Sequence, residues 1–99
     1  VSMAKGAVEG LTRALSAEFA PKIRVNAIAP SLTDTRIAKS MTSNEPLAKA
    51  VAALHALPRL GEADDMAAMA EILLTDSGGW ITGQVIAIDG GRSRARVKG

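Results

Sequence analysis

Apolar side chains follow the spacing of an α-helix through residues 2–20, where they recur every three or four positions. Pro21 follows directly and predicts the end of this helix. Gly6 and Gly10 stand four residues apart inside it, and each is expected to cost about 1 kcal/mol relative to alanine. Two glycines on one side of a helix leave a groove, so we expect the backbone of another segment to approach there.

Two short apolar runs predict β-strands, at residues 23–28 and 85–88. Their nearly continuous apolar character is typical of strands that are covered on both faces in a parallel sheet. Helices are predicted between them, over residues 36–41, from a cap at Ser43 or Asn44 to about residue 57, and over residues 66–74 after Asp64 or Asp65.

The order helix, strand, helices, strand is that of a βαβ crossover preceded by one helix, which predicts the α/β class. The two strands are expected to be parallel. Because two strands do not form a stable open sheet, further strands must come from another segment or molecule. Residues 31–35, Ser-Leu-Thr-Asp-Thr, follow the first strand at the carboxyl edge of the sheet, where open α/β sheets bind ligands.

The composition limits the classes of protein and of site that the chain can form. With 99 residues, of which 47% are apolar and 2% aromatic, the chain has the length of one small domain with an aliphatic core. It contains no cysteine, which excludes disulfides and cysteine-based metal sites, and no metal site is predicted. The absence of cysteine fits a reducing cytoplasm, where we expect the protein to lie. No apolar run approaches the roughly 20 residues that cross a bilayer, so no membrane contact is expected. The start at Val1, directly in helical sequence, predicts a truncated chain.

The formal net charge is +2, and basic residues cluster only in the tail, at Arg92, Arg94, Arg96 and Lys98. Such a cluster can contact phosphate or nucleic acid, or it can be a solvated terminus. No aromatic residue interleaves with these charges, so we favour the solvated terminus and expect no nucleic-acid partner.

Four blocks in order along the chain resemble the short-chain dehydrogenase/reductase family. They are Ala-Lys-Gly-Ala-Val-Glu-Gly-Leu-Thr-Arg at 4–13, Ile-Arg-Val-Asn-Ala-Ile-Ala-Pro at 23–30, Arg-Leu-Gly at 59–61 and Thr-Gly-Gln-Val-Ile-Ala-Ile-Asp-Gly-Gly at 82–91. The resemblance implies a partial Rossmann-type fold, a doubly wound parallel sheet of which this chain carries the last two strands and their helices. Residues 1–99 would then be the C-terminal part of a single NAD(P)-binding domain.

The resemblance also implies an oxidoreductase that uses NAD or NADP and transfers hydride to or from a carbonyl or alcohol substrate. The family's glycine-rich phosphate loop and catalytic serine lie upstream of the matching region. Family members commonly form dimers and tetramers. We therefore expect a homo-oligomer, with the groove at Gly6 and Gly10 and the stretch 66–88 in its interfaces.

Lys5 matches the family's catalytic lysine, which also holds the nicotinamide ribose. In the family a tyrosine precedes that lysine by four residues, so that the two are stacked neighbours on one helix face, and the ammonium lowers the pKa of the phenol. Here Val1 stands at the tyrosine position. His55 and Asp34 are the other candidate proton carriers, although His55 is expected on the surface of a helix. Lys5 could also be an exposed helix lysine.

Pro30, Ser31, Thr33 and Thr35 match the turn where the family contacts the nicotinamide carboxamide, and we predict that they bind the cofactor. The family prefers glycine where Ser31 stands, so the turn is expected to differ slightly. Capping of the next helix by Thr33 or Asp34 is the competing interpretation.

Two hypotheses therefore stay open. One is an active short-chain dehydrogenase/reductase with an atypical site. The other is a non-catalytic or truncated relative, with Val1 at the tyrosine position, that binds dinucleotide or acts only in oligomer assembly. Fold alone does not separate them. We also make two structural predictions. Asn26 is expected to have a buried side-chain amide that is bonded to backbone, and Gly90 and Gly91 are expected to form a tight turn.

Overall fold

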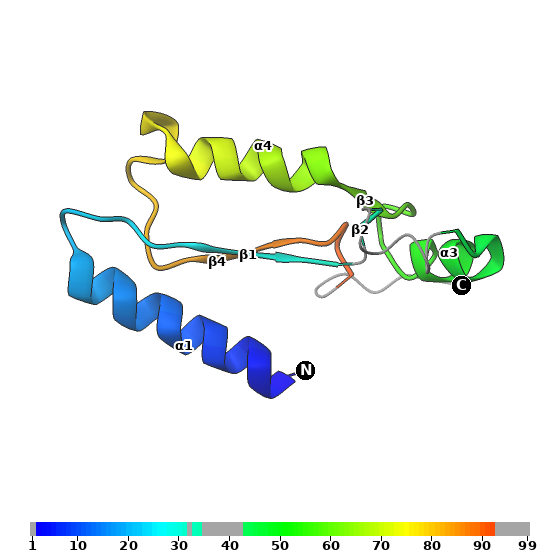
Figure 1. Cartoon of the computed structure of the whole chain (residues 1–99), viewed down its shortest axis with the longest axis horizontal. Coiled ribbons are helices and arrows are strands. Elements are labelled where there is room, and N and C mark those ends of the chain that lie inside the picture. The colour runs from blue at the N-terminus through cyan, green and yellow to red at the C-terminus, as the bar shows by residue number, and fades with distance from the viewer. Residues whose placement is uncertain (1, 32, 35–42, 93–99) are drawn as a thin grey trace. The chain divides into compact units, whose positions relative to one another are not determined.

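A computed structural model describes residues 2–31, 33–34 and 43–92 of the chain (Figure 1). Its elements are α1 (Ser2–Phe19), β1 (Ala27–Pro30), β2 (Thr33–Asp34), α3 (Glu45–Ala52), β3 (Gly61–Glu62), α4 (Ala63–Leu74), the short 3₁₀ helix η1 (Asp76–Gly78) and β4 (Val85–Ile88). Two two-stranded sheets form, β1 with β4 and β2 with β3. The β1 and β4 strands run in the same direction (Figure 1), and β2 pairs in parallel with β3, with Thr33 opposite Gly61 and Asp34 opposite Glu62.

The described chain divides into two compact units, Val1–Ile28 with Met69–Ile86, and Ala29–Ala68 with Ala87–Gly99. The α/β class is confirmed, as are the first helix and the strand at 85–88. The helix after Asn44 is also confirmed, with the Asn44 side chain accepting from the Leu47 backbone N–H, but it ends at Ala52 rather than near residue 57. The helix predicted at 36–41 lies outside the described residues.

The predicted position of the first strand, 23–28, is wrong, because β1 spans Ala27–Pro30. The residues before β1 bond to the segment before β4 through both backbone and side chains, and the Gly83 N–H donates to the Val25 carbonyl at 2.8 Å. The Val25 backbone N–H donates to the Thr82 hydroxyl at 3.1 Å, and the Asn26 amide spans the approach to β4 by donating to the Ile81 carbonyl at 3.0 Å and accepting from the Gln84 N–H at 3.1 Å. The predicted bonds of the Asn26 amide to the backbone are thereby confirmed, but the residue is half-buried rather than buried. An apolar pattern does not reveal such side-chain bonds.

In the first unit, α1 and the C-terminal part of α4 lie on opposite sides of the paired strands (Figure 1). Among the side chains that the structure describes in α1, Thr12 and Ser16 are buried, at 5% and 9% exposure, and their hydroxyls donate to the carbonyls of Val8 and Arg13. Gly83, with φ +74°, lies directly against this face, since a Cβ there would be 2.9 Å from the Ser16 hydroxyl oxygen. The close approach to α1 is therefore made at Ser16.

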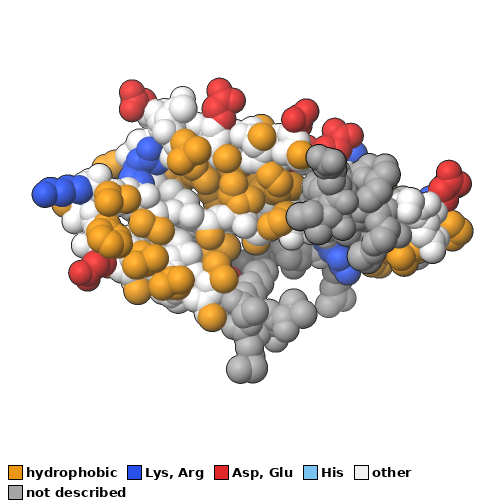
Figure 2. Space-filling model, in the orientation of Figure 1, with side chains coloured by type: hydrophobic (Ala, Val, Ile, Leu, Met, Phe, Trp, Pro, Cys, Tyr) orange, Lys and Arg blue, Asp and Glu red, His pale blue; other side chains and the backbone are white. Residues whose placement is uncertain are grey.

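Within the described part of the chain no other segment approaches Gly6 or Gly10, where a Cβ would meet nothing within 4 Å. Both glycines are exposed. The neighbouring apolar side chains are exposed as well, with Val8 at 48%, Leu11 at 60% and Phe19 at 44%. Figure 2 shows hydrophobic side chains gathered over this helix. This face of α1 is available to a partner.

Large apolar side chains in the described residues are nowhere fully buried, and Leu74 and Trp80 are 82% and 100% exposed. Exposed apolar surface on this scale is typical of interaction surfaces rather than of an isolated monomer. The apolar side chains of this chain therefore need cover from outside the described segments.

Gly83→Ala should lower the free energy of unfolding by about 2 kcal/mol. The new Cβ would occupy a positive-φ backbone, which costs a non-glycine residue about 1–2 kcal/mol, and would crowd the Ser16 hydroxyl at 2.9 Å. Gly6→Ala is the matched control, since it adds the same methyl group in open space and should raise helix stability by up to about 1 kcal/mol. Urea unfolding of the two variants measures both changes, and equal effects at the two positions would contradict the packing at Ser16.

Candidate functional site

His55 is the most buried side chain of the second unit, at 2% exposure. The expectation of a surface helix histidine is wrong, because α3 ends at Ala52 and the chain turns, so that the ring folds back beneath the last helical turn. Its Nδ1 lies 2.9 Å from the Val51 carbonyl oxygen and 3.2 Å from that of Ala52. Its Nε2 lies 2.8 Å from the hydroxyl oxygen of Ser31.

These contacts show which nitrogen of the neutral imidazole ring carries the hydrogen. A carbonyl oxygen only accepts, so Nδ1, which faces two of them, carries the hydrogen. In the neutral ring Nε2 is then a bare acceptor, and the Ser31 hydroxyl donates its hydrogen to it. Ser31 therefore directs its hydrogen towards His55 and its lone pairs elsewhere.

The turn after β4 packs against the same ring. Gly90 has φ +60° and Gly91 φ +88°, which confirms the predicted tight turn. A Cβ at Gly90 would lie 3.4 Å from the Cβ of His55 and 3.3 Å from the Leu57 carbonyl oxygen, while the Leu57 N–H donates to the Gly90 carbonyl at 2.9 Å. Arg92, just after the turn, donates from Nη1 to the Ser31 hydroxyl at 3.4 Å. His55 thus joins the end of α3, the residue after β1 and the turn after β4.

A pocket of about 320 Å³ opens beside this junction. Ser31, His55, Leu57 and Gly90 are among the residues that line it, all within the second unit. Its volume lies at the lower end of the range of small-molecule sites. The pocket combines apolar walls with the Ser31 hydroxyl and with the charged residues Arg59, Asp65 and Asp89.

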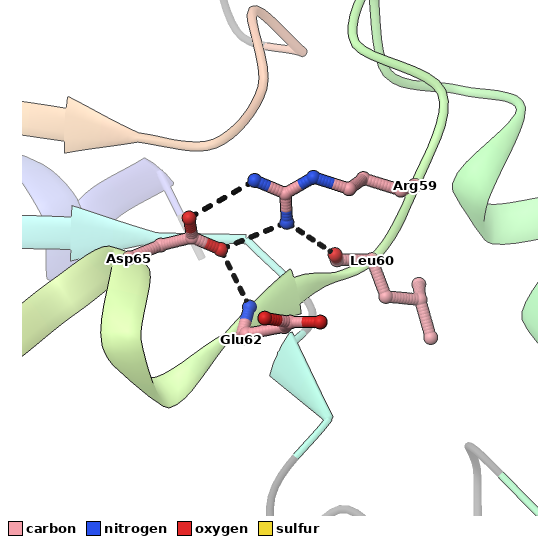
Figure 3. Close-up of polar contacts among 4 residues, drawn as sticks. All are labelled: Arg59, Leu60, Glu62 and Asp65. Carbon is pink, nitrogen blue, oxygen red and sulfur yellow. Dashed lines mark hydrogen bonds and ion pairs between the residues drawn. The ribbon is translucent and has the colours of Figure 1, made fainter.

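Arg59 and Asp65 form a bidentate ion pair in the same unit (Figure 3). Arg59 Nη1 and Nη2 donate to Asp65 Oδ2 at 2.8 Å and Oδ1 at 2.9 Å, and the Glu62 backbone N–H donates to Oδ2 at 2.7 Å. Arg59 Nη1 also donates to the Leu60 carbonyl at 3.0 Å. Asp65 therefore reaches back to the residue before α4 and caps the helix start, as a carboxylate in the first turn does. The hydrogen bond from Arg59, followed by that from Glu62, lowers the pKa of Asp65 from 3.8 to about 2.

This lowered pKa predicts an acid-dependent loss of stability. Because the folded-state pKa lies below the unfolded value, the ionised carboxylate stabilises the fold above about pH 3.8, and this contribution is lost as the pH falls towards 2. Melting temperatures measured between these pH values should therefore fall more steeply for the unmodified chain than for Asp65→Asn. Asp64→Asn, which removes a neighbouring exposed carboxylate, should follow the unmodified chain. Parallel curves for all three proteins would contradict the assignment.

The structure describes only some of the residues that the sequence predicts to bind the cofactor. Pro30 is the last residue of β1, and Thr33 lies in β2 opposite Gly61. Lys5 lies near the start of α1, and its side chain falls outside the described part of the structure, as do Val1 and Thr35. The structure brings Ser31 together with His55, a pairing that the sequence did not predict because no periodicity relates residues 24 positions apart.

Among residues 2–31, 33–34 and 43–92, no group of three or more histidine, cysteine, aspartate or glutamate side chains is arranged to hold a metal ion. Within the same segments, no helix has the length and apolarity to cross a membrane.

Comparison with known proteins gives a consistent family. A family model described as Enoyl-(Acyl carrier protein) reductase matches residues 1–93. Short-chain dehydrogenase/reductase SDRA of Arabidopsis thaliana is 41% identical over 87 residues, which are 88% of this chain and 34% of that protein. Tropinone reductase-like 3 of Erythroxylum coca is 39% identical over 87 residues, again 88% of this chain and 34% of that protein.

Similar solved structures come from the same family as these similar sequences. A short-chain type dehydrogenase/reductase from Mycobacterium ulcerans has a TM-score of 0.83 and 39% identity, with 93% of this chain and 34% of that one covered. A 4-hydroxyisoleucine dehydrogenase complexed with NADH has a TM-score of 0.85 and 32% identity, with 93% and 38% covered. The chain thus spans little more than a third of the length of the relatives it matches.

Proposed function

Because the chain belongs to the short-chain dehydrogenase/reductase family, we propose that residues 1–99 are the C-terminal part of one NAD(P)-binding Rossmann domain. We propose further that this domain transfers hydride between NAD or NADP and a carbonyl or alcohol substrate. The observation that carries the proposal is the match to the family along residues 1–93, together with the likeness to a dehydrogenase solved with NADH.

The described residues fit a nicotinamide group at the turn that follows β1. Open α/β sheets bind their ligands beyond the carboxyl ends of the strands, and Pro30 and Ser31 stand at that end of β1. The pocket of about 320 Å³ begins at Ser31. We propose that Pro30, Ser31, Thr33 and Thr35 contact the nicotinamide.

When bound, the dinucleotide would supply or accept the transferred hydride. We propose that the Lys5 ammonium holds the nicotinamide ribose hydroxyls and favours proton transfer at the substrate oxygen. The turn at Pro30 and Ser31 would orient the carboxamide, since a bond between the ring and a fixed backbone segment limits rotation of the reacting face.

The competing proposal is a protein that binds dinucleotide, or only assembles, without turning over a substrate. Val1 at the family's tyrosine position favours it, because valine has no proton to transfer. Both versions are expected in the cytoplasm as homo-oligomers, dimers or tetramers, that use the exposed apolar face of α1 and the stretch containing Ile72, Leu74 and Trp80.

Titration of the protein that contains this chain with NADH and NADPH tests both proposals. Binding followed by oxidation of the reduced cofactor with a panel of aldehydes and ketones would support the dehydrogenase. Saturable binding with no turnover would support the non-catalytic alternative. If neither cofactor binds at millimolar concentration, both proposals that involve a dinucleotide fail.

A further inference from the structure

We propose that the pocket beside Arg59 binds a small carboxylate, which the Arg59 guanidinium holds through its Nε–H and one N–H of Nη2. The inference goes beyond the proposed function, because it concerns Arg59 rather than the turn after β1 and needs no cofactor. Arg59, Leu57 and Ile88 are among the residues that line this pocket of about 320 Å³. The class of ligand follows from the donors that Arg59 still offers and from the apolar walls around them.

Arg59 has two donors that its ion pair does not use. A guanidinium carries five N–H groups and no acceptor. Nη1 donates one hydrogen to Asp65 Oδ2 and the other to the Leu60 carbonyl, and Nη2 donates one hydrogen to Asp65 Oδ1. Within the described residues, Arg59 makes no further hydrogen bond. Nε–H and the second hydrogen of Nη2 therefore remain for a ligand.

These two donors lie on one edge of the guanidinium. Asp65 occupies the end of the group, between Nη1 and Nη2, so the remaining donors lie on the adjoining edge, between Nη2 and Nε. Figure 3 shows this edge directed away from Asp65, Leu60 and Glu62. Two parallel N–H groups match the two oxygens of a carboxylate, which is the bidentate geometry that arginine favours. A neutral amide offers such an edge only one oxygen.

The ion pair fixes the orientation of this edge. Asp65 accepts from Arg59 at 2.8 and 2.9 Å, and the Glu62 backbone N–H holds Asp65 in turn at 2.7 Å. The guanidinium is thereby oriented before a ligand arrives, which lowers the entropy cost of binding. The Arg59 side chain is nevertheless 56% exposed, so a ligand can reach it. The hydrogen bond to Asp65 raises the pKa of Arg59, which therefore stays charged near neutral pH.

The charges around the pocket limit the affinity for an anion. Asp65 and Asp89 line the pocket with Arg59, so an anion gains little from long-range attraction. Binding would depend on the two directed hydrogen bonds and on contact with the apolar walls. Those walls include Leu57, Met66 and Ile88. A monocarboxylate with a short apolar body fits these conditions better than a dianion, and we expect a dissociation constant of about 1–10 mM.

Butyrate and butyramide test the class of ligand in the protein that contains this chain. The two molecules have nearly the same shape, but butyramide is uncharged and has one oxygen. Dissociation constants measured at pH 7 from the ligands' methyl NMR signals should be about tenfold lower for butyrate, because its bonds to the guanidinium are charge-assisted and paired. Acetate, two methylenes shorter, should bind more weakly than butyrate, by up to about fourfold for each methylene.

Variants of the pocket locate the bound carboxylate. Arg59→Lys keeps a positive charge beside Asp65 but cannot present two parallel N–H groups, so butyrate should bind at least about tenfold more weakly. Arg13→Lys makes the same change on the exposed surface of α1 and should bind butyrate like the unmodified protein. Leu57→Ala removes part of the apolar wall and should reduce the preference for butyrate over acetate. Melting temperatures identify any variant that fails to fold.

The Nε–H resonance of Arg59, assigned by its loss in Arg59→Lys, gives a direct measurement in the unmodified protein. It should shift on addition of butyrate and stay in place with butyramide. If butyramide binds as tightly as butyrate, or if the resonance does not move with butyrate, Arg59 is not a carboxylate site. Equal affinity of a folded Arg59→Lys for butyrate would overturn the proposal as well. None of these results depends on NADH or NADPH, so the proposed function can fail while this site stands.

Discussion

Arg24→Met should lower the free energy of unfolding by about 3 kcal/mol, the largest stability effect that we expect from one substitution in the described residues. The Arg24 guanidinium donates from Nη1 to the carbonyls of Leu73 at 2.7 Å and Gly78 at 2.8 Å, and from Nη2 to that of Thr75 at 3.3 Å. Hydrogen bonds from a charged group contribute about 1.5–3 kcal/mol each and are not additive.

The site explains why the loss should be large. The last carbonyls of α4 have no partners within the helix, and a positive charge beside them also favours the helix dipole. Methionine preserves the apolar stem of arginine and removes all three hydrogen bonds. The carbonyls of Thr75 and Gly78 also accept from the backbone N–H groups of Gly78 and Ile81 at 3.0 Å each, so the loss falls chiefly on the Leu73 carbonyl at the end of α4.

Urea unfolding of the chain measures this effect, with two controls. Arg24→Lys should recover only part of the loss, because an ammonium cannot reproduce the fork of the guanidinium. Arg13→Met makes the same change on the exposed surface of α1 and should alter stability by less than about 0.5 kcal/mol. If Arg24→Met and Arg13→Met were equally mild, the capping role would be wrong.

The second large effect is expected at Lys5 and concerns activity. If Lys5 holds the nicotinamide ribose and assists proton transfer, Lys5→Met should reduce kcat/KM by about 100-fold or more, within the range of general acid–base contributions. The KM for the cofactor should rise as well. Lys22→Met, which removes an exposed lysine beyond the end of α1, should leave both parameters unchanged.

A tyrosine at position 1 provides the converse test. Val1→Tyr restores the residue that the family has four positions before the lysine, where stacked neighbours on a helix interact. If the lack of a proton donor limits the protein, this variant should increase kcat by about 100-fold or more. An unmodified protein that already reduces carbonyl compounds rapidly, with no gain from Val1→Tyr, would show that another group supplies the proton.

The docking of α1 shows where sequence analysis succeeds and where it fails. The helical period predicted α1 to within one residue, because the spacing of apolar side chains is a local property. The same sequence suggested a close approach at Gly6 and Gly10, and within the described residues the structure adds a close contact at Ser16 and Gly83 that the sequence did not indicate. The local sequence pattern shows where a glycine stands in a helix. It does not show which residue, distant in the sequence, packs against that helix.

The position of the first strand also differs from the prediction made from local sequence. Residues 23–28 are apolar enough to predict a strand, but the regular strand begins at Ala27, and the side chains of Arg24 and Asn26 before it bond α4 and the residues before β4. The bonding partners lie about 50 positions away or more in sequence. Propensity is overridden where such long-range bonds form.

The amino-acid sequence alone determined the α/β class, α1 and β4, the family resemblance and the choice of candidate cofactor residues, because these depend on period, on local turn chemistry and on short motifs. Only the tertiary structure showed that His55 is buried against Ser31, that Arg24 caps α4 and that Gly83 meets Ser16. Each of these contacts joins residues far apart in the chain, and their geometry depends on how the segments pack rather than on any spacing that the sequence displays.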